Sequence, residues 1–202
     1  MYLPKHFEET RPEVLEALMA AYPLATLVTQ GGDGLEANHV PLVARRTVNG
    51  GLLLEGHVAR ANTLWQQVGQ DFLVVFQGPQ TYVSPSWYAS KKEHGKVVPT
   101  WNYAVVHAQG KLMAHDDPTW LQEFLSRLTQ THETKVGSDW KVTDAPEDFI
   151  EQLRKTIVGI EIPVTRIIGK WKVSQNRPVA DRVGVKAALE KLEPHSAKLV
   201  QT

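Results

Sequence analysis

The sequence predicts an α+β protein built around an antiparallel β-barrel. Short apolar runs separated by tight turns fill the first half of the 202-residue chain. Amphipathic helical patterns flank these runs, mainly in the second half. No repeat, low-complexity tract or linker divides the chain, so we expect one domain over residues 1–202. Its expected parts are an N-terminal helix region over 1–23, a barrel with inserted helices over 24–177, and a C-terminal helix and tail over 178–202.

The N-terminal half is predicted to begin with a helix and to continue as a three-stranded meander. Thr10 and Glu13 have the spacing of a capping box, and Pro23 stops the helix. Glycine-rich turns then separate three runs with strand character. These runs cover residues 25–29, 38–44 and 52–57.

The remaining elements alternate between strands and helices. Asn62 is an N-cap candidate for a short helix that ends at Gly69. Strand character then occurs at 72–76, 81–83, 101–108 and 111–114, and helices are expected from residue 117, from residue 144 and over 179–192. Residues 159–172 are expected to form paired strands broken at Pro163. Residues 84–99 show no periodicity, and such long irregular stretches usually carry function, so they are a candidate site loop.

Composition and charge exclude several classes of protein. The chain has no cysteine, which excludes disulfides, thiolate metal sites and cysteine nucleophiles and indicates a cytoplasmic protein. No stretch is apolar enough for a membrane span, and the eight histidines are scattered, so we predict no metal site. The 22 basic and 22 acidic residues cancel, which argues against a general nucleic-acid binder. DNA binding therefore has no support from net charge.

One region of the chain is strongly basic although the net charge of the whole chain is zero. Between Val164 and Lys191 there are seven lysines and arginines against two acidic residues. This region could serve an anionic ligand or a nucleic-acid backbone, and it could equally be a solvated face.

Two groups of residues have the composition of a binding site. His57, Arg60 and Asn62 follow a strand and open a helix, where free N–H groups and an arginine favour a phosphate. The alternative is an N-cap asparagine beside a solvated arginine. Aromatic rings beside hydroxyls and an amide, at 82–88 and 98–103, suit a planar heteroaromatic ligand, although the same rings could form the barrel core.

Four ordered motifs resemble the PaiB family of FMN-binding negative transcriptional regulators. They are Met1-Tyr-x-Pro-x-His-Phe7, Tyr82-Val-Ser-Pro-Ser-Trp-Tyr88, Val98-Pro-Thr-Trp-Asn-Tyr103 with Val106-His107, and Ser174-Gln-Asn-Arg177. The resemblance extends to about Gly184. It implies an FMN-binding split β-barrel of Greek-key type with flanking helices, in a homodimer with FMN at the subunit interface.

The resemblance also implies roles for individual residues. His57, Arg60 and Asn62 would contact the FMN phosphate. The flavin ring would lie near Ser84, Ser86, Trp87, Thr100 and Asn102. Further contacts would come from Lys172, Gln175, Asn176 and Arg177, reaching in from the partner subunit.

Two functions follow from this resemblance. The first is a flavin-binding repressor. The second is an FMN-dependent oxidoreductase, related to flavin reductases or pyridoxamine-phosphate oxidases, that does not bind DNA. In that second case Lys91, Lys92 and Lys96 would form a lid over an anionic substrate such as a reduced nicotinamide. No helix-turn-helix with basic recognition residues is evident in the sequence, and no catalytic residue is assigned.

Overall fold

The computed structural model describes residues 1–202 and contains nine strands and six α-helices. The strands are β1 (Glu8–Glu9), β2 (Leu24–Gly31), β3 (Gly34–Pro41), β4 (Val43–Arg46), β5 (Leu52–Ala59), β6 (Asp71–Val83), β7 (Thr100–Lys111), β8 (Met113–His115) and β9 (Ile157–Lys172). The helices are α1 (Pro12–Ala21), α2 (Ser90–His94), α3 (Pro118–Val136), α4 (Glu147–Arg154), α5 (Val179–Leu192) and α6 (Pro194–Ala197). Four short 3-10 helices complete them: η1 (Lys5–Phe7), η2 (Thr63–Gln66), η3 (Pro85–Trp87) and η4 (Val142–Asp144).

The chain forms two compact units. Unit 1 comprises Met1–Tyr22, Phe76–His107 and Ile168–Thr202, and unit 2 comprises Pro23–Val75 and Ala108–Ile167. The strand order is β3-β2-β6-β7-β9-β5-β4, with β1 and β8 paired to β9. The long strands β6, β7 and β9 contribute residues to both units.

Unit 2 curls in the manner of a barrel. Its hairpins β2–β3 and β4–β5 are antiparallel, and β5 pairs with β9. A Cβ on Gly56 in β5 would lie only 3.0 Å from the carbonyl oxygen of Pro41 in β3, so strands far apart in the strand order approach each other. Glycine is required at this contact because any side chain would displace the neighbouring strand.

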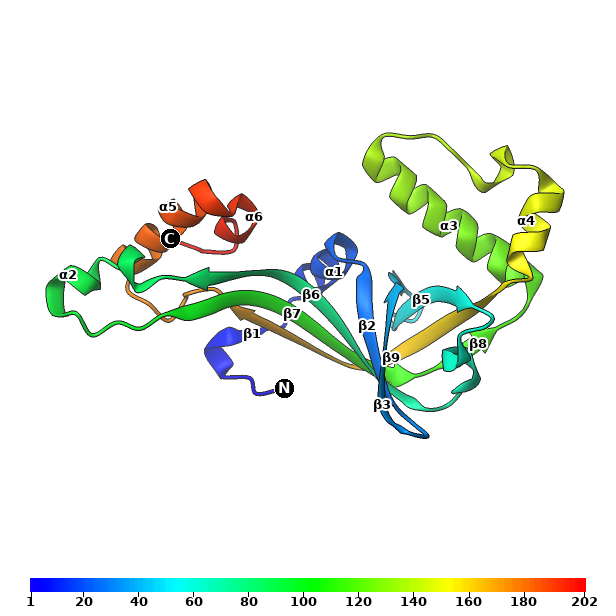
Figure 1. The fold of residues 1–202 in the computed structure, drawn as a ribbon, viewed down its shortest axis with the longest axis horizontal. Helices are drawn as coiled ribbons and strands as arrows, with labels where there is room; N and C mark the ends of the chain where they lie inside the picture. Colours follow the sequence, from blue (N-terminus) through cyan, green and yellow to red (C-terminus); the bar gives the residue numbers. More distant parts are fainter. The chain divides into compact units, whose positions relative to one another are not determined.

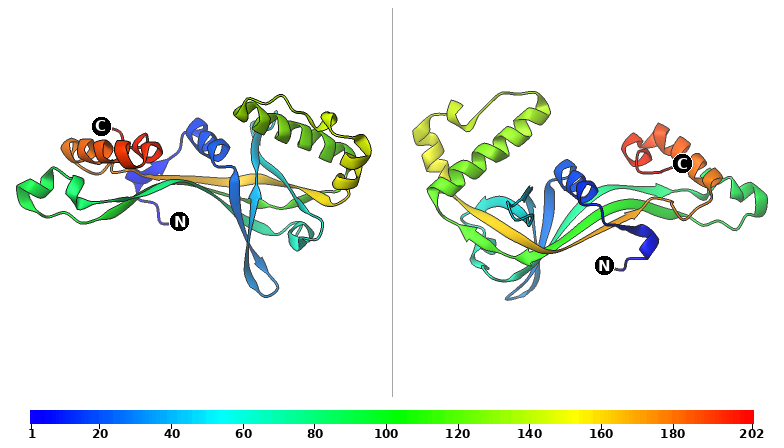
Figure 2. Two further views of the ribbon diagram at one scale, coloured as in Figure 1. Left: turned by 45° about the horizontal axis from the view of Figure 1, so that its top comes forward. Right: turned by 180° about the vertical axis from the view of Figure 1, so that it is seen from behind.

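Helices α3 and α4 lie on one side of β5 and β9 in unit 2 (Figure 2). The Trp120 ring occupies the space above Gly159, where a Cβ would come within 2.2 Å of it. Trp120 stacks on His115 and on Phe124, with ring centroids 4.3 and 5.2 Å apart. This aromatic stack anchors α3 to the sheet.

In unit 1, α5 and α6 lie along one side of β6 and β7 (Figure 1). Their core is a cluster of buried apolar residues that also holds Trp87 and Val97 at its edge. The cluster consists of Val83, Tyr88, Val185, Leu189, Ala197 and Val200. Gly184 brings α5 against η3, since a Cβ there would lie 2.1 Å from the Trp87 carbonyl oxygen.

A buried carboxylate joins α5 to α2 within unit 1. Asp181 is 1% exposed and accepts the Ser90 backbone N–H at 2.9 Å and the Ser90 hydroxyl at 2.7 Å. The predicted site loop over 84–99 therefore is not structureless, because it contains η3 and α2. Short helices and buried polar contacts fix this segment in place of an apolar helix face or strand face. For that reason its sequence shows no apolar periodicity.

The fold confirms the predicted α+β class and most elements, including α5, the helix expected from residue 117 and the Asn62 cap. The predicted three-stranded meander is wrong beyond β3. The next strand, β4, does not pair with β3, because β3 and β4 lie at opposite ends of the strand order. The chain bends at the buried Leu42, whose N–H is bonded to the Pro23 carbonyl at 2.8 Å.

Four further details differ from the prediction. No Thr10 side chain caps α1, whose N-cap position is Arg11. Residues 72–76 and 81–83 belong to one continuous strand, β6, and β9 runs unbroken through Pro163. Pro163 is tolerated because it stands at the last pair of the β5–β9 ladder, opposite Leu53, where a missing N–H costs little. The helix expected from Asp144 is α4, which starts at Glu147, after η4.

No helix combines the length and apolar character needed to cross a bilayer.

Candidate functional site

The predicted site residues fall into two groups, one in each unit. The unit-2 group is His57, Arg60 and Asn62. The unit-1 group is Ser84, Ser86, Trp87, Thr100, Asn102, Lys172, Gln175, Asn176 and Arg177. The two groups differ in how many intramolecular partners they already have.

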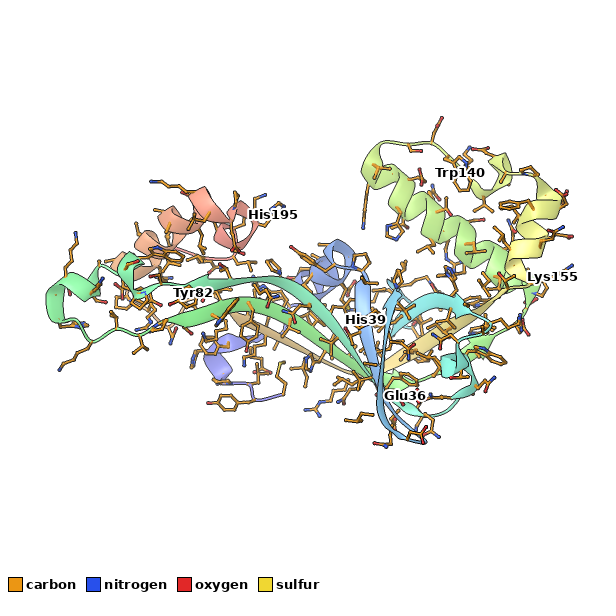
Figure 3. All side chains as sticks on the ribbon, in the orientation of Figure 1. Glu36, His39, Tyr82, Trp140, Lys155 and His195 are labelled. Carbon is orange, nitrogen blue, oxygen red and sulfur yellow. The ribbon has the colours of Figure 1, made fainter.

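The Arg60 guanidinium group makes four hydrogen bonds within unit 2. Its Nη1 donates to Asp116 Oδ2 at 2.9 Å, and Nη2 reaches the other oxygen of the same carboxylate. Nε donates to the Lys155 carbonyl at 2.8 Å, at the end of α4 (Figure 3), and Nη2 also reaches the Ile157 carbonyl. Arg60 lowers the pKa of Asp116 below its usual value, chiefly through these hydrogen bonds. A phosphate at Arg60 would have to displace an existing bidentate partner.

His57 and Asn62 also have structural roles. The His57 ring meets the Phe124 ring edge-to-face at 5.9 Å, and burial lowers its pKa, which favours the uncharged imidazole. Asn62 caps η2 by accepting the Leu64 N–H at 2.9 Å and donates to Asn38 at 2.9 Å. The phosphate assignment of these three residues stays a prediction.

The cavity beside Arg60 carries both signs of charge. It measures about 170 Å³ and is lined by three basic residues, Arg60, Arg154 and Lys155, and by two acidic residues, Asp116 and Glu151. The two carboxylates offset much of the attraction that the basic groups would exert on an anion.

The unit-1 group forms a different kind of pocket. It is small, about 60 Å³, and every residue that lines it is polar or charged. Its walls are Thr100 and Asn102 from β7, Lys172 from β9, and Ser174, Asn176 and Arg177 from the turn that follows β9. Five of these six residues are among the predicted cofactor contacts, so the structure brings them together.

The pocket is cationic and contains no carboxylate. Lys172 Nζ donates to the Thr100 hydroxyl and to the Trp101 carbonyl, which leaves one of its three donors. Burial lowers the pKa of Lys172, and Lys170 and Arg177 lower it further. The Arg177 guanidinium lies over the Tyr88 ring, 4.8 Å from its centroid, and forms no ion pair.

Ser174 is a pocket residue absent from the predicted set. It has φ +67° and is the only non-glycine residue with positive φ, a conformation that is uncommon for serine. Its hydroxyl and the Asn102 amide are buried and bonded to each other at 2.9 and 3.1 Å. The sequence motif that begins at Ser174 could have indicated that this residue belongs to the site. The backbone conformation of Ser174 could not be predicted from the sequence.

The other predicted unit-1 residues lie outside this pocket's lining. Ser84 and Ser86 bond to each other through their hydroxyls at 2.7 Å, and Trp87 packs against the α5–α6 core. Gln175 accepts the Val173 N–H at 2.8 Å and so stabilises the turn. These contacts shape the surroundings of the pocket.

Larger cavities lie elsewhere in unit 2. Volumes of about 440 and 510 Å³ border α3 and the segment from Ser138 to Glu147, including Trp140 and Val142 (Figure 3). They contain none of the predicted site residues. No group of three or more histidine, aspartate or glutamate side chains is arranged to hold a metal ion.

Comparisons with known proteins agree on a flavin-binding fold. Residues 1–166 match the family described as "Putative FMN-binding domain". A structure of the FAD and heme binding protein from Mycobacterium smegmatis superposes with a TM-score of 0.59 at 15% identity, covering 81% of this chain and 72% of that one. The fold is therefore a split β-barrel with flanking helices, as predicted.

Two relatives match nearly the whole chain. An uncharacterized protein from Emericella nidulans, AN0679, is 35% identical over 99% of this chain and 94% of its own. Protease synthase and sporulation protein PAI 2 from Bacillus subtilis is 32% identical over 98% of this chain and 93% of its own. The four motifs, the family match and this similarity together show that the chain belongs to the PaiB family of proteins with an FMN-binding domain.

Proposed function

We propose that this protein binds FMN through the polar pocket of unit 1 and acts as a flavin-dependent negative regulator of transcription. The observation that carries the binding proposal is a carboxylate-free pocket with Lys172 and Arg177, in a chain whose family is described by FMN binding. Bound FMN would supply one- and two-electron chemistry, and the protein would supply orientation and electrostatics.

The donor set fits a flavin. Lys172 and Arg177 offer positive charge, and Thr100, Asn102 and Asn176 offer hydroxyl and amide groups. FMN carries both an anionic phosphate and a ring edge rich in hydrogen-bonding atoms, so it requires both kinds of group. Ser84, Ser86, Trp87 and Gln175 remain proposed neighbours of the bound cofactor.

We also propose a homodimer. Tyr82 and Trp101 are 46% and 54% exposed, and their rings meet edge-to-face at 6.1 Å on β6 and β7 of unit 1 (Figure 3). Large exposed aromatic pairs are typical of interfaces. Sedimentation equilibrium with and without FMN tests this: a species of twice 22.6 kDa supports a dimer, and a monomer at all concentrations contradicts it.

The regulatory role is supported by the name of the Bacillus subtilis relative, a protease synthase and sporulation protein. Arg182, Lys186 and Lys191, which lie on α5 in the basic region and outside the pocket, are the proposed DNA-facing surface. A gel shift on genomic fragments at several salt concentrations tests this role. Affinity that falls steeply with salt supports phosphate contact, and no shift at low salt contradicts DNA binding.

An FMN-dependent oxidoreductase is the second candidate. Lys91, Lys92 and Lys96 are exposed in and just after α2, where they could attract an anionic reductant. Stopped-flow oxidation of a reduced nicotinamide by the FMN-loaded protein tests this function. A rate that is unaffected when all three lysines become alanine would remove the lid role.

Flavin binding itself is tested by fluorescence quenching. FMN titrated into the purified protein should lose fluorescence with a sharp, stoichiometric end point. Unchanged fluorescence together with no heat of binding in calorimetry would refute the proposal.

A further inference from the structure

We infer that a hollow in unit 2 is a binding site for a neutral saccharide. This hollow (the α3 hollow) lies between α3 and residues 138–143. It contains none of the predicted site residues, so the inference goes beyond the proposed function and does not depend on flavin binding. The size of the hollow, the polar face of α3, an aromatic ring and the balance of charge all support it.

The α3 hollow is large enough for a whole small molecule. Its volume is about 440 Å³. Sites for small organic ligands measure about 300 Å³ or more. Val142 is the one lining residue that is buried, so the hollow is open to solvent and a ligand can enter without a change in the fold.

One wall of the hollow is a polar stripe along α3. Its residues recur at the spacing of a single helix face, and they are Ser126, Thr129, Gln130, Glu133 and Thr134. A helix face that is turned toward its own chain is normally apolar, as it is where Trp120 and Phe124 anchor α3 to the sheet. The polar stripe instead faces residues 138–143 across an unfilled space. Its hydroxyl, amide and carboxylate groups offer donors and acceptors to a ligand rich in hydroxyls.

The opposite wall supplies an aromatic ring. Trp140 is 44% exposed and lines the hollow (Figure 3). Its backbone N–H is bonded to the Ser138 hydroxyl at 3.2 Å, and its indole N–H has no partner within the chain. A sugar ring has C–H groups on its faces and hydroxyls around its rim. One face of the sugar therefore packs on the indole while the rim reaches the polar stripe.

The charges in the hollow disfavour an ionic ligand. The carboxylates of Glu133 and Asp139 and the ammonium of Lys141 line it, and none of the three forms an ion pair. The two carboxylates repel a phosphate or another anion, and the ammonium repels a cation. All three groups can bond to the hydroxyls of a neutral ligand, and such charge-assisted hydrogen bonds are stronger than neutral ones.

The experiment measures sugar binding by NMR in the presence and absence of FMN. The probes are glucose, N-acetylglucosamine and maltose, with glucose 6-phosphate as an anionic comparison and phenylalanine as a zwitterionic one. Saturation-transfer difference spectra give the affinities. The indole N–H signal of Trp140, which is identified by its loss in Trp140→Phe, shows where the probe binds.

Three variants alter the hollow and two serve as matched controls. Trp140→Ala removes the ring, Glu133→Gln removes one charge, and Thr129→Leu fills the space with a residue that favours helix. Phe149→Ala and Glu123→Gln are the controls, because both residues are exposed in unit 2 and neither lines the hollow. Thermal unfolding of each variant checks that it folds.

A saccharide site predicts a specific pattern. At least one of the three neutral sugars should bind saturably and shift the Trp140 signal, with or without FMN. Trp140→Ala should weaken this binding by about tenfold, as expected for a lost aromatic contact, and Glu133→Gln by about three- to tenfold. Thr129→Leu should abolish binding without lowering the unfolding temperature. Both controls should bind the sugar as the wild type does.

Three outcomes would overturn the inference. They are no saturable binding of any neutral sugar at millimolar concentrations, equal losses in Trp140→Ala and Phe149→Ala, and tighter binding of glucose 6-phosphate or phenylalanine than of every neutral sugar. The result is separable from the proposed function. A protein that binds a sugar in the α3 hollow but no FMN supports this inference alone, and one that binds FMN but no sugar refutes this inference alone.

Discussion

The two groups of predicted site residues look alike in sequence and differ in the structure. Each contains an arginine, an asparagine and hydrogen-bonding neighbours. In unit 2, Asp116 and two backbone carbonyls satisfy Arg60, and Asn62 caps η2. In unit 1, Lys172 and Arg177 face a pocket that contains no acid. The difference teaches that residue type marks a candidate site, and that the partners its charged groups already have separate one candidate from the other.

The strongest test of the unit-1 framework is Gly184→Ala. Alanine in a helix interior normally adds about 1 kcal/mol of stability over glycine. Here the added Cβ would lie 2.1 Å from the Trp87 carbonyl oxygen, which is backbone and cannot rotate away. We expect a net loss of about 1–3 kcal/mol in the free energy of unfolding, measured in urea.

Ala187→Gly is the control for helix propensity, since Ala187 is exposed on the same helix. It should cost about 1 kcal/mol without weakening FMN binding. A Gly184→Ala protein that is more stable than the wild type would show that α5 does not pack closely on η3.

Two asparagines, one from each group, give a matched comparison. Asn102→Ala leaves the buried Ser174 hydroxyl without its partner, so it should cost about 1–3 kcal/mol and weaken FMN binding as well. Asn62→Ala removes the η2 cap and should cost about 1 kcal/mol with FMN affinity unchanged. Urea unfolding and FMN titration of both variants provide the measurement, and equal effects on FMN affinity would erase the distinction between the groups.

Acid should destabilise unit 2 through His57. Burial lowers the pKa of His57, so below its ordinary value of about 6.5 the unfolded chain takes up a proton that the folded chain refuses. As the pH decreases below about 6.5, the free energy of unfolding therefore decreases, by at most about 1.4 kcal/mol per pH unit for one group. The decrease ends once the pH is below the pKa of His57 in the folded protein.

His57→Gln should flatten this dependence between pH 7 and pH 5, as measured by thermal unfolding. His107 in unit 1 also has a pKa lowered chiefly by burial, so His107→Gln is the parallel variant for the other unit. An unchanged pH slope in His57→Gln would mean that the imidazole is as well solvated in the folded protein as in the unfolded chain.

The smallest expected effect belongs to Arg60→Gln. Because its partner Asp116 is largely exposed, the ion pair should contribute little to stability, and FMN affinity should change by less than about twofold. The pKa of Asp116 should rise toward its usual value, which NMR titration can follow. A large loss of FMN affinity would instead restore Arg60 as the phosphate contact.

Local sequence signals predicted much of the fold. The Asn62 cap and the start of a helix at residue 117 depend on neighbours a few residues away, and both were predicted. The continuity of β6 and β9 was not predicted, because Gly78 and Pro163 are residues that usually interrupt a strand. Tertiary contacts accommodate them within the sheet and so outweigh their low intrinsic preference for strands.

The candidate site was predictable to a similar degree. Residue type identified Thr100, Asn102, Lys172, Asn176 and Arg177, which line one pocket. The Arg60–Asp116 pair joins residues 56 positions apart, and no spacing rule could have indicated it. Ser174 required knowledge of a backbone dihedral angle that serine rarely adopts.

The discontinuity of unit 1 has a consequence for chain synthesis. Unit 2 is complete once residue 167 has been made, whereas unit 1 needs its first 22 residues and also the stretch from Ile168 onward. As a chain emerges from the ribosome N-terminus first, Thr100 and Asn102 wait for Lys172 and Arg177, and Ser90 waits for Asp181 across 91 positions. The unit-1 pocket is thus assembled late, and if this pocket binds FMN as proposed, the nascent protein should acquire its barrel before it acquires affinity for FMN.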